Sequence, residues 1–512
     1  MPAERTRRGF LAALGAVGIA GCSSPSEGGS TPTLTPADVP GRETSTPTPT
    51  DQPGETVDFF GNRTSVARLE TVRRTYSLLP ARYGADGARV SLSFVETATA
   101  DHPLTVRGTL ENGARWANTF ALDRVPPFGD GGRVGEIDRP DDRSASGRRY
   151  TEGMELLFVP TGNTPHAERT PDVELADDGT WRLADPLSGS WYPETHRLEA
   201  GETITGEWYV VGGANGGDAG RPTGRYEFGF GDSRFDIAVW DSGRPGPEIS
   251  SRFVDATPTE MPGDGDVAWF HEATTESEVF LRPETERAEV PAEFEFELVN
   301  HDTDPLAGNP YGWTLYKRFE ATWHRIAPWL VPTPLSVVLP GDTHEYSIRA
   351  YHDEPVPTED DATGGAVGHL GGGTYALEAS YSHPDRDRRH AALFELVGPA
   401  VTVEPTPGAT VDRNADRITV TRPAWGDEER PPDASMCVER ANDVGETRAE
   451  RIIPEQVYRR PFRVLRDVVP HLGNGTAVVV RADETLVERF VGYGESERAF
   501  RWAGETYRAR RR

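Results

Sequence analysis

Side chains that could do chemistry are scattered along this chain rather than gathered in one motif. The stretch 383–390 carries two histidines and two aspartates in a polar turn, and His271-Glu272 lacks the second histidine of a zinc-protease helix. Residues 302–304 and 177–178 supply carboxylates, the oxygen ligands that Ca²⁺ prefers, but neither follows an EF-hand spacing. Nucleophile elbows, phosphate-binding loops and dinucleotide fingerprints are absent from the sequence. We therefore expect no enzyme, no catalytic residue, no metal site and no cofactor.

The first 22 residues form the most specific pattern. A basic stretch containing Arg7 and Arg8 leads into Phe10 and Leu11, and a short apolar run then ends at Cys22. This order is typical of a signal peptide. About eleven apolar or small residues are too few to cross a bilayer core, which needs about 20. The segment is therefore expected to direct the protein to its destination rather than to span a membrane.

These residues resemble two known signals. The Arg7-Arg8-Gly-Phe10-Leu11 string is similar to the twin-arginine export signal, and the small residues before Cys22 resemble a lipoprotein cleavage box. The resemblance implies a protein that is exported folded, cut before Cys22, and held by lipid on Cys22. We expect it outside the cytoplasm, anchored to the outer face of the cell membrane.

The second cysteine, Cys437, is then alone, so the mature chain can form no internal disulfide. A nucleophilic thiol needs a base, and nothing in the sequence places His471, the one histidine of the last hundred residues, near it. We expect a buried, inert thiol.

Residues 23–56 are expected to be a disordered linker. Ser, Thr, Pro and Gly make up 23 of the 33 residues from 23 to 55, and such a segment buries too little apolar surface to fold. A tether of this kind lifts the folded part away from the membrane. Asn62 and Asn474 begin sequons for N-glycosylation, a pattern that is short and often arises by chance.

The charge is strongly acidic. The formal charge is −28, and Lys317 is the single lysine beside 53 arginines. This composition resembles proteins of halophilic archaea, in which carboxylates keep a protein soluble while salt screens repulsion. Nucleic-acid binding is not expected, because this charge repels phosphates. A polytopic membrane protein, a collagen and a disulfide-stapled miniprotein are also excluded.

The folded part is expected to be mostly β. Short alternating or β-rich segments are separated by Gly, Pro and Asp clusters. An internal repeat is visible, because the order Trp, Gly turn and Gly-x-Tyr strand occurs twice. The first copy carries the anchors Trp181, Gly201 and Tyr226, and the second carries Trp323, Gly341 and Tyr375.

The second copy, which also has an Asn300 loop, resembles bacterial immunoglobulin-like domains of extracellular proteins. In the first copy Glu111-Asn112-Gly113 replaces that loop, and an insertion spans about 126–150. The resemblance implies two tandem immunoglobulin-like β-sandwiches at 57–241 and 267–404, joined by a linker at 242–266.

Residues 410–512 are expected to form a small α+β domain of no recognised family. We predict a strand at 418–421, one helix over 454–471, and two hairpins, 477–481 with 486–491 and 500–502 with 506–508. From residue 451 onward 13 arginines face eight acids. This excess indicates either docking on the acidic modules, with a frayed tail at 510–512, or a basic face for an acidic partner or anionic lipid.

Three classes of function fit these observations. The first is a non-enzymatic cell-surface lipoprotein that uses its sandwiches for spacing or protein recognition, with the membrane and an unidentified surface protein as partners. The second is an extracytoplasmic solute-binding, sugar-binding or protease-inhibitor lipoprotein. The third is an enzyme whose site follows no motif. A solute binder should show a deep pocket with aromatic walls, an inhibitor a protruding loop at 126–150 or 353–370, and an enzyme a cleft with perturbed acids or histidines.

Overall fold

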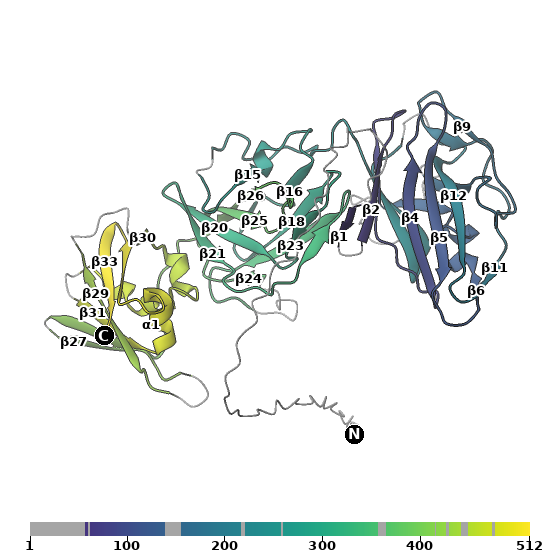
Figure 1. Ribbon diagram of the computed structural model, residues 1–512. Coiled ribbons are helices and arrows are strands. Elements are labelled where there is room, and N and C mark those ends of the chain that lie inside the picture. Colours follow the sequence, from purple (N-terminus) through teal and green to yellow (C-terminus); the bar gives the residue numbers. More distant parts are fainter. Residues whose placement is uncertain are drawn as a thin grey trace, which may run out of the picture. The chain divides into compact units, whose positions relative to one another are not determined.

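The computed structural model describes residues 57–59, 62–138, 155–216, 221–257, 260–356, 365–414, 416–425, 430–441, 449–473 and 477–512. These residues are mostly β, as the sequence predicts (Figure 1). The residues predicted to direct export, Arg7, Arg8, Phe10 and Leu11, the residue predicted to carry lipid, Cys22, and the predicted linker at 23–56 lie outside them.

The first sandwich is built from fourteen described strands. They are β1 (Val57–Phe59), β2 (Asn62–Arg68), β3 (Thr75–Leu78), β4 (Ala88–Glu96), β5 (Leu104–Asn112), β6 (Asn118–Ala121), β7 (Val134–Asp138), β8 (Leu156–Pro160), β9 (Val173–Leu175), β10 (Trp181–Leu183), β11 (Thr195–Leu198), β12 (Thr203–Gly212), β13 (Gly224–Phe230) and β14 (Ser233–Trp240). One layer has the order β2-β3-β14-β13-β7, and the other contains β8-β12-β5-β4. A two-residue β7–β8 pairing joins the layers. Buried Phe158 from one layer meets Phe228 and Phe235 from the other, and Trp208 packs in the same core.

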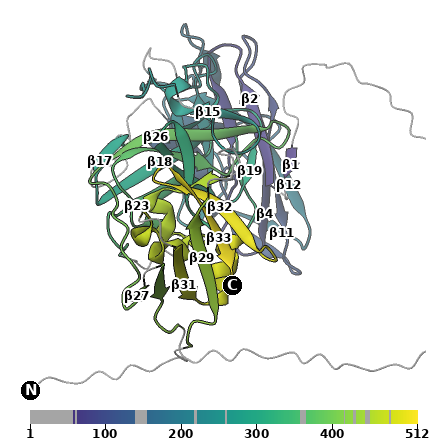
Figure 2. The same cartoon turned by 90° about the vertical axis from the view of Figure 1, so that its left-hand side faces the viewer.

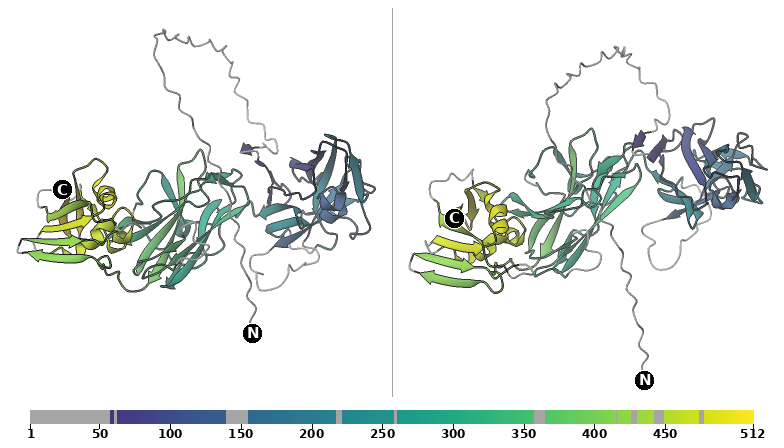
Figure 3. Two further views of the ribbon diagram at one scale, coloured as in Figure 1. Left: turned by 90° about the horizontal axis from the view of Figure 1, so that it is seen from below. Right: turned by 60° about the horizontal axis from the view of Figure 1, so that its bottom comes forward.

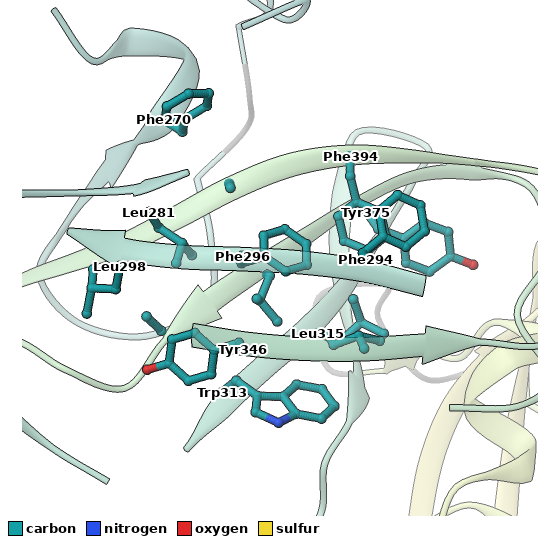
Figure 4. Close-up of a cluster of buried hydrophobic side chains, with 14 of the residues drawn as sticks. Phe270, Leu281, Phe294, Phe296, Leu298, Trp313, Leu315, Tyr346, Tyr375 and Phe394 are labelled. Carbon is teal, nitrogen blue, oxygen red and sulfur yellow. The ribbon is translucent and has the colours of Figure 1, made fainter. Parts of the chain in front are cut away.

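The second sandwich has twelve described strands. They are β15 (Asp266–Trp269), β16 (Val279–Pro283), β17 (Arg287–Glu289), β18 (Ala292–Asn300), β19 (Leu306–Gly308), β20 (Trp313–Phe319), β21 (Thr322–Ala327), β22 (Ser336–Val338), β23 (Thr343–Ala350), β24 (Ala366–Val367), β25 (Gly373–Ala379) and β26 (Arg388–Val397). One sheet follows β15-β26-β25-β20-β21 and the other β16-β18-β23-β24. Their facing side chains form one aromatic core, in which Phe294 and Phe296 touch Phe394 (Figure 4).

The internal repeat is confirmed at its turn and tyrosine anchors. Gly201 and Gly341 have φ values of 74° and 75°, the left-handed region that favours glycine, and each precedes a long strand, β12 or β23. Tyr226 and Tyr375 each donate from the hydroxyl to a carbonyl four residues upstream, at 2.9 and 2.6 Å.

Two details of the predicted repeat were wrong. Trp181 lies in β10 beside β12, whereas Trp323 lies in β21 beside β20, so the tryptophans belong to different layers of the shared fold. Asn112 does not break the repeat, because it is as buried as Asn300 and makes the same bonds. Its side-chain amide donates to the carbonyls of Leu198 and Trp116, as that of Asn300 does to Val338 and Asp304.

The C-terminal domain has a seven-stranded sheet with one α-helix on one face (Figures 2 and 3). Its elements are β27 (Thr410–Asn414), β28 (Arg417–Thr421), β29 (Ala434–Arg440), β30 (Glu450–Arg451), β31 (Ala477–Ala482), α1 (Glu484–Val491), β32 (Glu497–Trp502) and β33 (Glu505–Arg511). The predicted strand at 418–421 and the hairpin at 500–508 are confirmed as β28 and as β32 with β33.

Two predicted elements of this domain were wrong. Residues 454–471 form three 3₁₀ segments, Pro454–Tyr458, Arg463–Asp467 and Val469–His471, instead of one α-helix. Prolines at 461 and 470 lack the N–H that α-helical bonding needs, and the chain uses bonds three residues apart instead. Residues 486–491, predicted as the second strand of a hairpin, belong to helix α1. Asp483 caps this helix, because its carboxylate accepts the Leu486 N–H at 3.0 Å.

Candidate functional site

A buried ion pair joins the second sandwich to the C-terminal domain. Lys317, on β20, contacts Glu455, in the 3₁₀ segment Pro454–Tyr458, and their side chains are 8% and 3% exposed. The Lys317 ammonium also donates to the Gly371 carbonyl at 3.3 Å. Water is excluded from both charges, so each depends on the other for its solvation.

Packing around this pair is tight. The Lys317 ammonium lies 5.3 Å from the centre of the Tyr375 ring, whose hydroxyl donates to the same Gly371 carbonyl. Burial raises the pKa of Tyr375 well above its usual value. A β-carbon at Gly373 would lie 3.3 Å from Lys317 Cε. Ile453, two residues before Glu455, belongs to the sandwich core.

A second layer of polar contacts borders the pair. Arg459 donates to the Gly368 carbonyl at 2.5 Å, and burial lowers its pKa to about 10. The ring of His369 stacks on Tyr458 with centres 3.7 Å apart, and the Arg466 guanidinium lies 4.8 Å from the same tyrosine ring. Burial, followed by Arg459 and Arg466, lowers the pKa of His369 to about 4, so it is neutral at neutral pH.

The two sandwiches are joined by smaller contacts. Leu79, Ala238 and Trp240 of the first sandwich form a buried cluster with Leu339 of the second. Arg225 bridges Asp342 at 3.2 Å. The stretch 242–266 packs against the second sandwich, because its Phe253 and Met261 join a cluster on β15, β20, β21, β25 and β26.

Two of the acidic and histidine-bearing stretches noted in the sequence meet. His383 Nε2 lies 3.1 Å from Asp304 Oδ2, and Arg386 donates to Asp302 at 2.9 Å. Desolvation, followed by Asp302, raises the pKa of nearby Glu278. Arg386 forms ion pairs with the carboxylates of Asp302 and Asp304. The cluster is therefore a salt bridge between loops.

The other candidates also have structural partners. Asp178 accepts hydrogen bonds from Thr180 at 3.0 Å and from Arg182 at 2.5 Å. His271 is buried beside Trp269, and desolvation lowers its pKa. Across the described ranges, no three His, Cys, Asp or Glu side chains gather as metal ligands would.

The C-terminal arginines are not frayed, contrary to that expectation. Arg510 and Arg511 belong to β33 and pair with acids of their own domain, Arg510 with Glu439 at 2.7 Å and Arg511 with Glu488 at 2.8 Å. Docking on the acidic modules does occur at Arg451, which pairs with Glu320 of the second sandwich. Cys437 is a free thiol in β29 and is buried, as predicted.

The exposed apolar loop 329–335 was missed by sequence reasoning. Leu330 and Leu335 are 77% and 61% exposed. The loop is held at its start, because Trp329 packs on Phe462, and in its middle, where the Pro332 carbonyl accepts from Asn309 at 2.6 Å. The clue in the sequence is three prolines, at 328, 332 and 334, among large apolar residues.

One pocket among the described residues offers no aromatic wall. It lies in the first sandwich, measures about 300 Å³, and is lined by Arg169, Asp172, Asp185, Ser188 and Trp191 among others. Trp191 is 1% exposed, so its ring face is not presented to a solute.

Asn62 begins β2, but its side chain lies outside the described part, as does all of Asn474. In the ranges that the structure describes, no helix has the length and hydropathy needed to cross a membrane.

No protein-family model and no curated protein matches the chain. Two solved structures are distantly similar. One is a polysaccharide lyase with 8% identity and a TM-score of 0.14, covering 64% of this chain and 36% of its own. The other, with 10% identity and a TM-score of 0.16, is Escherichia coli α2-macroglobulin activated by porcine elastase, covering 74% of this chain and 30% of its own. The chain thus spans about a third of each structure, and these scores carry no argument about function.

Proposed function

We propose that this protein is a non-enzymatic, lipid-anchored cell-surface protein whose β-sandwiches act as spacers and as modules for protein recognition. The observation that carries the proposal is the buried Lys317–Glu455 joint, together with the apolar contact of Leu79, Trp240 and Leu339. Contacts of this kind fix the orientation of neighbouring domains, which a spacer requires. The signal and lipid-box residues support the location.

The location is tested by fractionating cells. Replacing Arg7 and Arg8 with lysines should keep the precursor inside the cell, whereas Cys22→Ser should release the exported chain into the medium. An epitope inserted in the exposed Ala503-Gly504 turn should be reached by antibody on intact wild-type cells. Unchanged membrane retention after both sets of substitutions would refute the anchor.

The loop 329–335 favours protease inhibition as a second candidate function. Endopeptidase grooves bind extended segments, and this loop presents Leu330 on a backbone fixed by prolines and by Asn309. The soluble Cys22→Ser chain should inhibit subtilisin-like or chymotrypsin-like enzymes, and Leu330→Asp should abolish the inhibition. Equal inhibition by the wild-type loop and the Asp variant would exclude this role.

A further inference from the structure

Each sandwich has one end formed by the same pair of turns. In the first sandwich these are residues 112–117 and 199–202, which we name the Asn112 end. Asn112 N–H donates to the Glu202 carbonyl at 2.9 Å, and Gly201 N–H donates to the Asn112 carbonyl at 2.9 Å. The second sandwich repeats both bonds with Asn300, Gly341 and Asp342.

The two ends differ in what covers them. A β-carbon at Gly341 would lie 2.5 Å from the Ala238 β-carbon and 2.8 Å from the Trp240 ring, so this end is in close contact with the first sandwich. Among the residues that the structure describes, nothing lies within 4 Å of the equivalent position at Gly201. The same end is therefore an interface in the second sandwich, whereas no described part of the chain covers it at Gly201 in the first.

The uncovered end carries an exposed tryptophan. Trp116 is 62% exposed, and its carbonyl is fixed by the Asn112 side-chain amide at 2.8 Å. In the second sandwich the equivalent residue is Asp304, which His383 pairs within that sandwich. Tryptophan is the type of residue that dominates the affinity of protein interfaces. Because its backbone is already fixed, little conformational entropy is lost when it binds.

The charges around Trp116 nearly cancel, unlike those of the chain as a whole. Exposed or half-buried arginines and glutamates alternate around this end, and the pairs Arg89–Glu111 and Arg197–Glu199 are both 3.3 Å apart. Arg115 and Glu202 add one exposed charge of each sign, and Asp86, whose carbonyl accepts from Asn118, adds one negative charge, so three arginines face four acids. Two copies of a chain with a charge of −28 repel each other over most surfaces, but much less across a nearly neutral one.

We infer that the Asn112 end is a self-association surface, at which two copies of this chain pack around their Trp116 side chains. A twofold arrangement needs only this self-complementary patch, with arginines of one copy facing glutamates of the other. The inference does not depend on the lipid anchor, since the surface lies within the first sandwich.

Sedimentation of the soluble Cys22→Ser chain tests the inference at about 0.2 M and about 2 M NaCl. We expect a dimer in both salts, because apolar contacts persist where charge pairs are screened. Trp116→Ala should weaken association by more than tenfold, while Trp116→Phe and Tyr493→Ala, at a 92% exposed tyrosine of the C-terminal domain, should not. A monomeric wild-type chain at concentrations on the order of 100 μM, or unaltered association of Trp116→Ala, overturns the inference.

Disulfide trapping gives an independent readout. In the Cys22→Ser chain the remaining thiol, Cys437, is buried. Arg115→Cys should place two thiols near the twofold axis and yield an intermolecular disulfide on mild oxidation. Glu495→Cys, at an exposed position in the C-terminal domain, is the matched control and should form no intermolecular disulfide. Equal cross-linking of both variants contradicts the proposed surface.

Discussion

Removing one member of the Lys317–Glu455 pair should loosen the C-terminal domain from the second sandwich. Both side chains are less than a tenth exposed, so Glu455→Gln leaves a buried ammonium without its counter-charge. Breaking a buried pair from one side costs about 3–5 kcal/mol. Lys317→Arg should also destabilise, because a planar guanidinium is larger than the ammonium packed against Tyr375 and Gly373.

Urea unfolding of the Cys22→Ser chain, combined with hydrogen exchange of residues 454–471, measures this loss where it occurs. Lys317→Met with Glu455→Leu should recover most of the stability, since apolar pairs replace buried ion pairs at little cost. Glu505→Gln breaks an exposed pair with Arg440, 45% and 55% exposed, and should change the free energy by less than about 1 kcal/mol. A Glu455→Gln effect no larger than that of Glu505→Gln would refute the reasoning.

Three further predictions concern stability. Burial lowers the pKa of His390 to about 4, so the unfolded chain binds more protons between about pH 4 and 6.5. The free energy of unfolding should fall on acidification through that window by up to about 1.4 kcal/mol per pH unit from this residue, and His390→Gln should flatten that part of the slope in urea titrations. Asp483→Ala removes the cap of α1 and should cost about 1 kcal/mol, whereas Asp483→Asn should cost little; equal losses would argue against capping. Asn112→Ala and Asn300→Ala should each lower the thermal stability of their own sandwich by a similar amount, about 1–3 kcal/mol, and a loss from only one of them would contradict the structural equivalence.

The features that the sequence predicts well are local. A glycine at the turn and a tyrosine bonded four residues upstream leave a short pattern, so Gly201, Gly341, Tyr226 and Tyr375 could be matched between the copies. Asn112 was misjudged because its role depends on the Leu198 carbonyl, 86 residues away. No spacing rule within the Glu-Asn-Gly triplet shows that contact.

The errors in the C-terminal domain have a different origin. A run of six residues at 486–491 is too short to separate a strand period from a helical one, and the deciding signal is Asp483 at the capping position. Lys317 could be noted as the single lysine, but its partner lies 138 residues further along the chain. The joint is therefore visible only once the fold brings the two elements together.

The rarity of lysine has a practical consequence at this joint. Since the other 53 of the 54 lysine and arginine residues are arginine, an amine-directed acylating reagent meets one side-chain amine besides the α-amine of the N-terminus, and the Lys317 amine is shielded by Glu455 and Tyr375. Acylation at Lys317 then proceeds only when the C-terminal domain separates from the second sandwich. The rate at which the peptide containing Lys317 gains mass therefore measures how often that joint opens, without any introduced label.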